Sequence, residues 1–349
     1  MGEYEDVAVL YVSVPSLRQS GKLVDRVSLT KDNGIIEIGV TAPVLTHRSR
    51  NAIDRAYKRG ARKGIRALRQ QWQGHPDIAL AQTSLPAGQI ARYLYDKYEL
   101  PYGVIEHFSF WDRIIQNQKE EVISVYSSSS FLGAVSFYLR DVIKKQLPNI
   151  KDPEFAPNVL GRAFEHYNVE EKKLVIDDAK PFKWLWIGDD KQEKHPDLLA
   201  RTLARLPKNR ITVTVVGEGR FESLRALQRQ GYRIQFYKNV PRSRMPDMMS
   251  RHNALISTSF IETFGMAIIE MLSLGRPVAI TPSGGPEMFL TPDRGIVAGE
   301  HTAIAVAEAM QTLMNTFERF NSEQLRSGII NEYGSQAYHR RLLELINKI

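Results

Sequence analysis

Two carboxylates, Glu262 and Glu270, are separated by seven residues in a segment that otherwise has the composition of a protein core. The segment, residues 257–287, reads STSFIETFGMAIIEMLSLGRPVAITPSGGPE and carries a third acid, Glu287, after a glycine-rich turn. One carboxylate accepts hydrogen bonds from two hydroxyls, so it is a natural ligand for a sugar diol. The structural alternative is that Glu262 caps a helix and Glu270 is a solvated acid on it.

The elements expected around these acids explain how they could meet one ligand. Residues 254–258, ALIST, have the composition of a buried strand, and residues 265–275, GMAIIEMLSLG, have helical spacing that ends at Gly275. Gly265 is therefore expected at a helix N-terminus, where free amides and the helix dipole suit a phosphate and glycine lets a ligand approach the backbone. Glu262 precedes that helix and Glu270 lies in its first two turns, so both can face the same ligand.

Short apolar segments alternate with helical patterns along the chain, which is typical of parallel sheets covered by helices on both faces. The expected strands are residues 7–14, 35–40, 77–82, 102–107 and 122–127 in the first half and 183–189, 211–219, 233–239, 254–258 and 277–281 in the second. This pattern predicts an α/β protein of two Rossmann-like domains joined by the proline-containing linker 146–160. Ligands of such sheets bind outside the carboxyl ends of the strands, so the site is expected in the cleft between the domains.

Composition excludes several classes of protein. The chain has 349 residues, of which 43% are hydrophobic and 25% charged, and it contains no cysteine, so disulfides, thiolate metal sites and cysteine nucleophiles are excluded. No apolar run approaches the roughly 18 residues that cross a bilayer, and acids rather than bases precede the first apolar run at the N-terminus. We expect a cytoplasmic protein of about two domains that could associate peripherally with a membrane.

The net charge of +8 is concentrated in one segment. Nine basic residues and a single acid, Asp54, fall between Arg48 and Arg69, which leaves 38 charges of each sign elsewhere. On a helical wheel one arc carries seven bases and no acid: Arg55, Lys58, Arg59, Arg62, Lys63, Arg66 and Arg69. Gly60 and Gly64 lie on the opposite arc, which predicts a close packing contact. The basic arc is either a solvated face or a docking surface for a polyanion, such as anionic lipid or nucleic acid; we favour the docking surface.

The order of motifs resembles the retaining glycosyltransferases of family 4, which have the two-domain GT-B fold. The segment from Glu262 keeps that family's order: Glu, seven residues, Glu, a Gly-x-Pro-Val strand and a Gly-Gly turn followed by Glu287. The stretches WLWIGDDKQEKHPDLL, VTVVGEG and APNVLGRAFE resemble its first two C-domain strands and its linker. The similarity is strongest over residues 183–300, weaker over 76–109, and poor before that.

The resemblance implies a role for several residues of this sequence. Glu262 would hold hydroxyls of the transferred sugar, Glu270 the ribose hydroxyls and Lys194 the diphosphate, while His107 would lie on the sugar and acceptor side. The catalytic group would then be Glu262, His107 and Lys194, and the donor-binding group would be Gly188, Lys194, Gly217, Gly265, Met266 and Glu270. Arg55, Arg59, Arg62 and Arg66 would form the acceptor or polyanion surface. The alternative is that neither residue has a functional role: Lys194 would then be a solvated loop lysine, and His107 an ordinary histidine at the end of a strand.

Two departures from the family pattern concern the phosphate and acceptor sides. The family usually has an arginine soon after the glycine of the first C-domain strand, where it binds the diphosphate together with the lysine. Here Asp189 follows Gly188. Either another base, such as Lys191, takes the place of that arginine, or the loop is arranged differently. The N-terminal glycine-rich loop is replaced by SVPSLRQSGKLVDR, which contains only Gly21. Asp189 and Asp190 lack the spacing of a metal-binding pair and the histidines are scattered, so no metal is expected.

The sequence thus predicts a metal-independent retaining glycosyltransferase without a cofactor, which uses a nucleoside-diphosphate-sugar, most simply a UDP-sugar, as co-substrate. The acceptor would be lipid-linked or a polysaccharide precursor, or else a hydroxymethylated base in DNA. A non-catalytic nucleotide-sugar-binding protein and a phosphorylase or epimerase are the alternatives. The expected domains are 1–150 on the acceptor side, 151–330 for the nucleotide-sugar, and a helix at 331–349 that packs back on the first domain.

Overall fold

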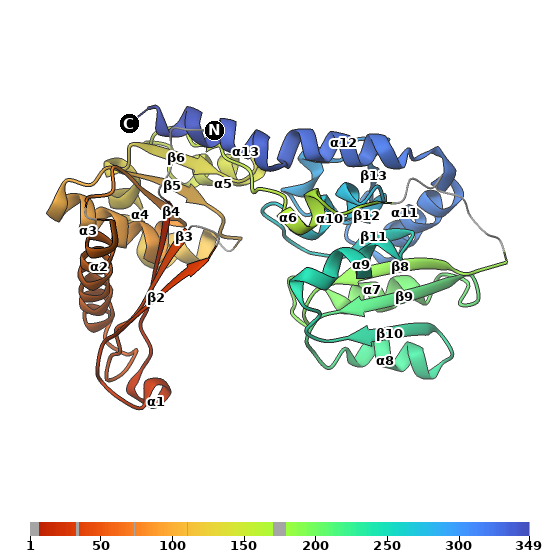
Figure 1. Cartoon of the computed structure of the whole chain (residues 1–349). Coiled ribbons are helices and arrows are strands. Elements are labelled where there is room, and N and C mark those ends of the chain that lie inside the picture. The colour runs from red at the N-terminus through yellow and green to blue at the C-terminus, as the bar shows by residue number, and fades with distance from the viewer. Residues whose placement is uncertain (1–6, 33–34, 73, 110, 170–178, 349) are drawn as a thin grey trace.

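Two α/β halves face each other across a wide gap in the computed structural model, and a helical segment runs along the top of both (Figure 1). The structure describes residues 7–32, 35–72, 74–109, 111–169 and 179–348. The N-terminal acids used above as an argument against a leader lie in residues 1–6, outside the described residues. The predicted α/β class with two Rossmann-like units is confirmed by this arrangement.

The C-terminal half is built on one six-stranded sheet with the order β10-β9-β8-β11-β12-β13, and every neighbouring pair is parallel. Its strands are β8 (Phe182–Ile187), β9 (Ile211–Val216), β10 (Arg233–Tyr237), β11 (Ala254–Ser257), β12 (Val278–Ile280) and β13 (Gly295–Val297). Its helices are α7 (Pro196–Leu203), α8 (Glu222–Arg229), α9 (Met245–Ser250), α10 (Met266–Ser273), α11 (Ala303–Asn315) and α12 (Ser322–Tyr333), with short turns η2 (Arg242–Arg244), η3 (Pro286–Phe289) and η4 (Phe317–Arg319).

The N-terminal half contains two sheets. A parallel sheet has the order β4-β5-β6-β7, and a three-stranded sheet has the order β1-β3-β2, in which β2 runs antiparallel to β3. The strands are β1 (Ala8–Ser13), β2 (Arg26–Asp32), β3 (Ile35–Thr41), β4 (Ala79–Gln82), β5 (Tyr102–Glu106), β6 (Phe131–Ala134) and β7 (Glu154–Phe155). The helices are α1 (Leu17–Ser20), α2 (Arg50–Trp72), η1 (Ser84–Gly88), α3 (Gln89–Tyr98), α4 (Trp111–Ser128), α5 (Phe137–Gln146) and α6 (Arg162–Glu165).

Two predicted elements of the N-terminal half are wrong. Residues 122–127, expected as a strand, are the last part of α4, and the sheet instead uses β6. Val122, Val125 and Tyr126 are buried because this face of the helix covers the core, so an apolar run alone did not distinguish strand from helix. The expected linker 146–160 also contains β7, which pairs with β6 and so extends the N-terminal sheet. The strands β2 and β13 were not predicted.

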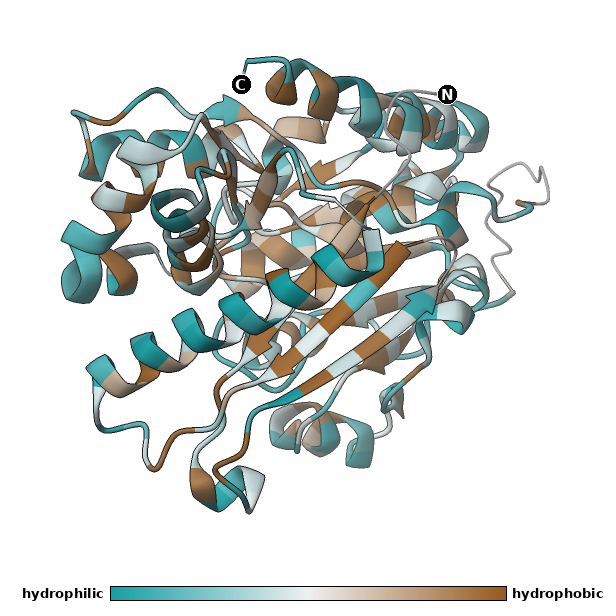
Figure 2. Ribbon diagram, turned by 60° about the vertical axis from the view of Figure 1, so that its left-hand side comes forward, coloured by the Kyte–Doolittle hydropathy of each residue, from teal (hydrophilic) through white to brown (hydrophobic). Residues whose placement is uncertain are grey.

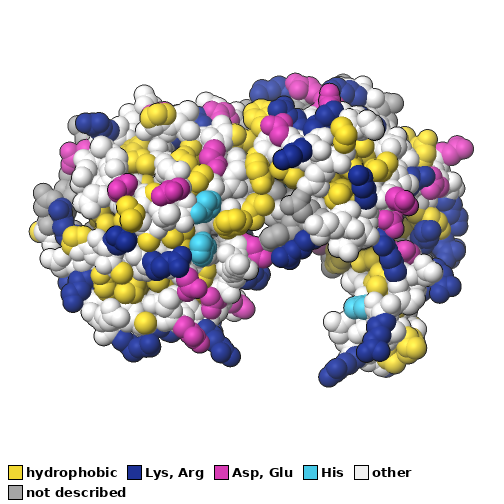
Figure 3. Space-filling model, turned by 180° about the vertical axis from the view of Figure 1, so that it is seen from behind, with side chains coloured by type: hydrophobic (Ala, Val, Ile, Leu, Met, Phe, Trp, Pro, Cys, Tyr) yellow, Lys and Arg dark blue, Asp and Glu magenta, His cyan; other side chains and the backbone are white. Residues whose placement is uncertain are grey.

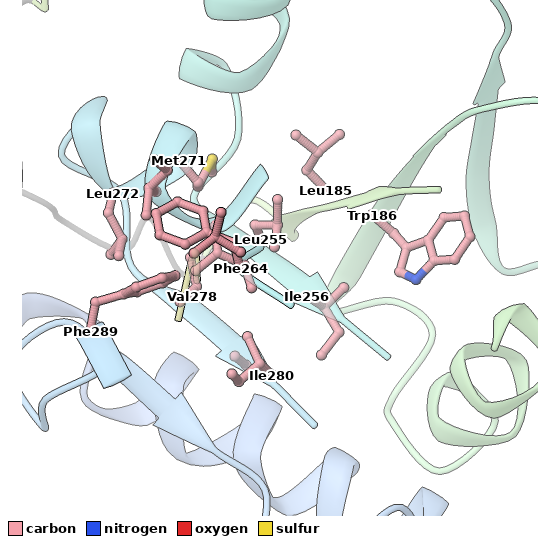
Figure 4. Packing of buried hydrophobic residues seen from close by; sticks show 14 of the residues in the cluster. Leu185, Trp186, Leu255, Ile256, Phe264, Met271, Leu272, Val278, Ile280 and Phe289 are labelled. Carbon is pink, nitrogen blue, oxygen red and sulfur yellow. The ribbon is translucent and has the colours of Figure 1, made fainter. Parts of the chain in front are cut away.

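The core of the C-terminal half holds the strand ends in place. Leu185, Leu255 and Val278 are each at most 1% exposed and occupy three adjacent strands. Figure 4 shows Leu255 and Val278 beside Phe264 and Phe289, which come from the segments that follow β11 and β12. Continuous apolar strands of this kind are expected where helices cover both faces of a parallel sheet. The loops at the carboxyl ends therefore rest on a rigid base.

The chain returns to the N-terminal half through α13 (Ser335–Ile346), which Figure 1 shows lying over that half. Near its end, the Lys348 ammonium pairs with Glu154 of β7, and the Arg341 guanidinium lies 5.8 Å from the ring centre of Phe155. Where the chain crosses between the halves, the Leu160 amide donates to the Tyr333 carbonyl at 2.7 Å. The last helix thus binds the first half to the second.

The helix α2 packs closely on the three-stranded sheet, as its two glycines predicted. Figure 2 shows α2 running diagonally across this sheet. A Cβ atom on Gly60 would lie 2.3 Å from a methyl carbon of Val12, and one on Gly64 would lie 2.3 Å from a methyl carbon of Leu10. Both distances are far below van der Waals contact, so the side chains of β1 occupy the space that the glycines leave.

Replacing Gly64 by alanine should lower the free energy of unfolding. Alanine would favour an exposed helix by about 1 kcal/mol. Here the overlap with Leu10 should outweigh that gain, since overpacking a core costs roughly 1–3 kcal/mol. Urea denaturation followed by circular dichroism measures the difference, with Lys58→Ala on the exposed side of α2 as the control. A variant as stable as the wild-type protein would contradict the close packing.

Candidate active site

A cavity of about 210 Å³ opens at the carboxyl ends of β8 and β11, where open parallel sheets bind ligands. Its lining comes from the end of β8, the loop before α7, the end of β11, the start of α10 and one linker residue. The lining residues are Asn158, Ile187, Lys194, Leu255, Ser257, Glu262, Thr263, Phe264, Gly265, Met266, Ala267 and Ile268. Three residues of the predicted donor-binding group, Lys194, Gly265 and Met266, therefore meet the predicted catalytic residue Glu262 in one cavity.

The loop that carries Glu262 is held by the glycine turn that follows β12. The Glu262 amide donates to the Ser283 carbonyl at 2.9 Å, and the Gly285 amide donates back to the Glu262 carbonyl at 2.8 Å. A Cβ on Gly285 would lie 2.1 Å from the Thr263 carbonyl oxygen, so only glycine fits there. Glu287 lies in η3 and accepts the Gly284 amide at 2.8 Å, so this acid shapes the turn.

Gly265 begins α10 in the left-handed region, with φ of +90°, and the helix ends before Gly275 at φ of +68°. The predicted helix and both of its glycine boundaries are thus confirmed. Met266 and Ala267 follow Gly265, and the first amides of a helix have no intrahelical acceptor. Both residues line the cavity, so the positive end of α10 faces it.

Glu262 forms an ion pair with the Lys194 ammonium within the cavity. The Ser259 hydroxyl also donates to this carboxylate, at 3.1 Å. Glu262, which was predicted to hold the sugar, and Lys194, which was predicted to hold the diphosphate, are therefore adjacent and oppositely charged.

A buried hydroxyl fixes the backbone that carries Lys194. The Thr258 hydroxyl donates to the Lys194 carbonyl at 2.9 Å and accepts the indole N–H of Trp186 at the same distance. Trp186 is 1% exposed and Thr258 is fully buried, so this contact joins β8, β11 and the lysine loop inside the core. The loop, and not only the lysine side chain, is held in place.

Glu270 lies one turn beyond Met266 on the same face of α10, and it is buried. It is not among the residues that line the cavity, and its carboxylate pairs with the Arg242 guanidinium from η2. Burial raises the pKa of Glu270 to about 7, although the charge of Arg242 and its hydrogen bond act in the opposite direction. Its interpretation as a solvated acid is therefore wrong.

Sequence reasoning missed Arg242, whose side chain is 62% exposed while that of Glu270 is 3% exposed. The guanidinium lies 5.4 Å from the ring centre of Phe164, in the helix α6 after the linker. The signal in the sequence is weak, because Arg242 is one of many arginines and lies 28 residues from its partner. An arginine thus stands beside the acid that was predicted to bind ribose.

His107 follows β5 and lies at the junction of the two halves. Its backbone carbonyl accepts the Thr263 hydroxyl at 3.0 Å, and its ring Nε2 lies 2.6 Å from the Gln82 amide oxygen. Burial lowers the pKa of His107, against the opposing influence of the Glu106 charge and of a hydrogen bond with Asn158. A neutral imidazole at pH 7 can both donate and accept a hydrogen bond.

Glu106 positions this histidine and was also missed by sequence reasoning. The carboxylate is fully buried and accepts the amides of His107, Phe108 and Ser84 at 2.9–3.1 Å together with the Tyr126 hydroxyl at 2.9 Å. Burial raises the pKa of Tyr126 well above the usual range, together with the nearby Glu106 charge. An acid at the end of an apolar strand was the available signal.

Gly188 and Gly217 support the base of the lysine loop. A Cβ on Gly217 would lie 1.9 Å from the Gly188 carbonyl oxygen, and a Cβ on Gly188 would lie 3.0 Å from the Lys194 side chain. Neither glycine lines the cavity. They allow the ends of β8 and β9 to approach each other, and their predicted contact with a donor stays a prediction.

The two aspartates after Gly188 have structural partners. Asp189 accepts the Glu218 amide at 3.1 Å and pairs with Lys191 at 3.0 Å, and these contacts lower its pKa in that order of importance. Asp190 accepts the amides of Arg220 and Phe221 at 3.0 and 2.9 Å. Lys191, the base nearest in sequence to the missing arginine, is thus paired with Asp189, and both alternatives for this loop stay predictions.

The predicted basic surface lies apart from the cavity. Figure 1 places α2 on the side of the three-stranded sheet that faces away from the C-terminal half. Arg55, Arg62 and Arg66 are exposed, whereas Arg59 donates to Asp25 at 2.9 Å and to the Pro43 carbonyl at 3.1 Å. The sequence placed no acid on this arc, but Asp25 reaches it from the segment before β2. This correction removes Arg59 from the freely available bases.

The described part of the chain contains no helix with the length and apolar character needed to cross a membrane. Within the same residues, no three or more His, Asp and Glu side chains are grouped as metal ligands would be.

Comparison with known proteins gives a family match for the C-terminal half. Residues 181–316 match the model for "Glycosyl transferases group 1". A curated relative, probable sucrose-phosphate synthase 4 of Oryza sativa subsp. japonica, is 30% identical over 87 residues, which are 24% of this chain and 8% of that protein. The chain thus spans a small fraction of this relative's length. Both findings support a glycosyltransferase, while the specific family 4 and retention of configuration stay predictions.

Solved structures resemble this chain over most of its length. A sucrose-phosphate synthase from Thermosynechococcus elongatus matches with a TM-score of 0.76 and 15% identity, over 98% of this chain and 88% of that one. Anabaena HepE in complex with UDP-glucose matches with a TM-score of 0.67 and 15% identity, over 83% of this chain and 82% of that one. At such low identity these similarities show the GT-B fold.

The pKa of Glu270 predicts how stability depends on pH. The folded state holds this carboxyl at about 7 against an ordinary value of 4.5, so between these values it binds more protons than the unfolded state. The free energy of unfolding should therefore fall as pH rises through this window, by roughly 3 kcal/mol at most, and level off above it.

Glu270→Gln removes this titration, so the variant should gain stability relative to the wild-type protein between about pH 5 and about pH 8. Urea denaturation across that range gives the difference. Glu308→Gln, on the exposed side of α11, is the matched control and should follow the wild-type curve. Parallel curves for wild type and Glu270→Gln would contradict the raised pKa.

Proposed function

We propose that the chain is a retaining, metal-independent glycosyltransferase that moves a sugar from a nucleoside-diphosphate-sugar to an acceptor hydroxyl. The observation that carries this proposal is the convergence of Lys194, Glu262 and the N-terminus of α10 in one cavity. Cation, carboxylate and free amides are the groups that a diphosphate joined to a sugar requires. The group 1 family match over residues 181–316 supports the same class of reaction.

Lys194 and α10 would stabilise the leaving diphosphate. Breaking a glycosyl–phosphate bond builds negative charge on the phosphate oxygens, and preorganised donors lower the free energy of that state. The Lys194 ammonium and the first amides of α10 are such donors. Glu262 pairs with Lys194, so a diphosphate that bound the lysine would free the carboxylate for sugar hydroxyls.

Glu270 would bind the two ribose hydroxyls, as the sequence resemblance implies, and Arg242 beside it would favour the ionised form of its carboxylate. We propose a UDP-sugar as donor because Anabaena HepE, which has a similar fold, forms a complex with UDP-glucose. UDP-glucose is the ligand of that protein, so it is the first donor to test with this chain.

The acceptor would approach from the N-terminal half, past His107. The Thr263 hydroxyl of the cavity donates to the His107 carbonyl, which supports a place for His107 beside the transferred sugar in this proposal. Its neutral ring could hold a hydroxyl without placing a second positive charge beside the donor. We propose a lipid-linked or polyanionic acceptor, on account of the basic residues concentrated in this half.

Substitution of the two glutamates should separate binding from turnover. With a UDP-sugar selected by thermal shift from UDP-, GDP-, ADP- and dTDP-sugars, Glu270→Gln should weaken donor binding by about 10- to 100-fold, the effect of losing a charged hydrogen bond. Glu262→Gln should lower kcat more than it raises the donor Kd. Calorimetry and initial rates give both quantities, and Glu308→Gln serves as the control. Equal effects of both changes on Kd and kcat would contradict the assignment.

Activity should survive excess EDTA, because Lys194 and α10 supply the positive charge that a metal would otherwise provide. Lys194→Ala should in turn lower kcat by about 100- to 1,000-fold, as removal of one preorganised donor does in other enzymes. Initial rates with and without EDTA, followed by added Mg²⁺ or Mn²⁺, provide the measurement. Loss of activity with EDTA and its return with a metal would overturn the role of Lys194.

A further inference from the structure

We propose that a second pocket, between α2 and α3, binds a phosphomonoester group and is separate from the donor cavity. The pocket has a volume of about 430 Å³, which lies in the range of small-ligand sites. Its lining residues are Arg62, Ile65, Arg66, Arg69, Gln70, Lys97 and Tyr98, none of which lines the donor cavity. This inference does not depend on the proposed glycosyl transfer.

The pocket is lined by four cations and no acid. Within the part of the chain that the structure describes, none of Arg62, Arg66, Arg69 and Lys97 forms an ion pair. Other cations of the same two helices are neutralised, since Arg50 pairs with Glu121, Arg59 and Lys63 with Asp25, and Arg92 with Asp96. Among the described residues Arg55 and Lys58 of α2 likewise form no ion pair, so the pocket is distinguished by having four such cations in one lining.

The helix geometry makes this charge unfavourable without a ligand. Arg62 and Arg66 are four residues apart on α2, and Arg69 follows three residues later, so the three side chains share one face. Like charges at this spacing repel one another, and an anion bound between them removes the repulsion. A solvated helix face does not require such an arrangement.

Aromatic contacts hold two of the cations in place before any ligand binds. The Arg69 guanidinium lies 4.8 Å from the ring centre of Tyr98, and the Lys97 ammonium lies 5.5 Å from the same centre on α3. The stacked Arg69 side chain also lines the pocket. A guanidinium held in this way is preorganised to bind an anion.

The chemistry of the lining identifies the class of ligand. Arginine presents planar pairs of N–H donors that match two oxygens of a phosphate, and a phosphomonoester carries close to two negative charges at neutral pH. Gln70 can bond a neighbouring hydroxyl, and Ile65 offers an apolar surface. A phosphomonoester on a small hydroxylated group fits this combination better than an isolated carboxylate does.

The position of the pocket explains why it does not bind the donor. Its two helices lie at the edge of the molecule away from the C-terminal half (Figure 1). Figure 3 shows Lys and Arg side chains gathered along that outer edge of the N-terminal half. A ligand held there leaves the donor cavity open, so the pocket would attach the enzyme to a phosphorylated molecule while transfer proceeds elsewhere. The phosphomonoester could belong to a membrane lipid or to a soluble metabolite.

The test uses one soluble and one membrane-bound phosphomonoester. Glycerol 3-phosphate is titrated by calorimetry, and phosphatidylcholine vesicles with and without phosphatidic acid are tested by co-sedimentation, all in saturating UDP so that the donor cavity is blocked. Arg66→Glu removes one pocket cation, and Arg62→Glu is a second variant in case the first does not fold. Arg55→Glu is the matched control, because it makes the same charge change on an exposed residue of α2 outside the pocket. Circular dichroism verifies folding.

Wild-type protein should bind at least one probe, and either pocket variant should weaken that binding by about tenfold or more, as loss of a charge-assisted hydrogen bond does. Arg55→Glu should change it by less than about twofold. Binding of glycerol 3-phosphate identifies a soluble source, and binding only to vesicles with phosphatidic acid identifies a lipid. If neither probe binds, or if Arg55→Glu weakens binding as much as Arg66→Glu, the pocket is part of a general basic surface and the proposal fails.

Discussion

The close backbone contact between the loop 262–265 and the turn 283–285 is the constraint on which the rest of the site depends. Gly285 lies against the Thr263 carbonyl with no room for a side chain, so the two segments cannot separate without losing two backbone hydrogen bonds. This contact holds Glu262 beside Lys194 and sets the start of α10, and thereby the depth of Glu270. The Gly-Gly turn thus positions the site although its two glycines carry no side chain that could take part in the chemistry.

Each of the two acidic groups of the site is paired with a cation. Isolated carboxylates are costly to bury, and here Lys194 neutralises Glu262 and Arg242 neutralises Glu270. A ligand that brings both a diphosphate and hydroxyls can exchange with both pairs at once. A ligand with only one of these groups would leave one cation or one carboxylate without its partner, so under the proposed function the two ion pairs would favour a ligand that carries both.

Elements were predicted correctly from the sequence where a local pattern is compatible with only one type of secondary structure. The spacing from Gly265 to Gly275 predicted α10, and the inward glycines predicted the contact of α2 with its sheet. Residues 122–127 were assigned wrongly because an apolar run fits a strand or a buried helix equally. Arg242 and Asp25 could not be found, because their partners are distant in sequence and nothing local marks them. The chemical roles of Glu262 and Glu270 came from the family resemblance and stay predictions.

The path of the chain between the halves limits how the cleft can open. It crosses once after β7 and once more at Gly334, and the two crossings are joined by the Leu160–Tyr333 hydrogen bond and by Glu165, which accepts the Ser335 amide at 3.1 Å. Because the two crossings are adjacent and hydrogen-bonded to each other, rotation of one half about a single axis through them would keep these bonds. Rotation about any other axis would strain them. Because Lys348, just after α13, pairs with Glu154 of β7, α13 would move together with the first half. Any closure of the two halves over the donor would therefore be a rotation about the axis through these two crossings.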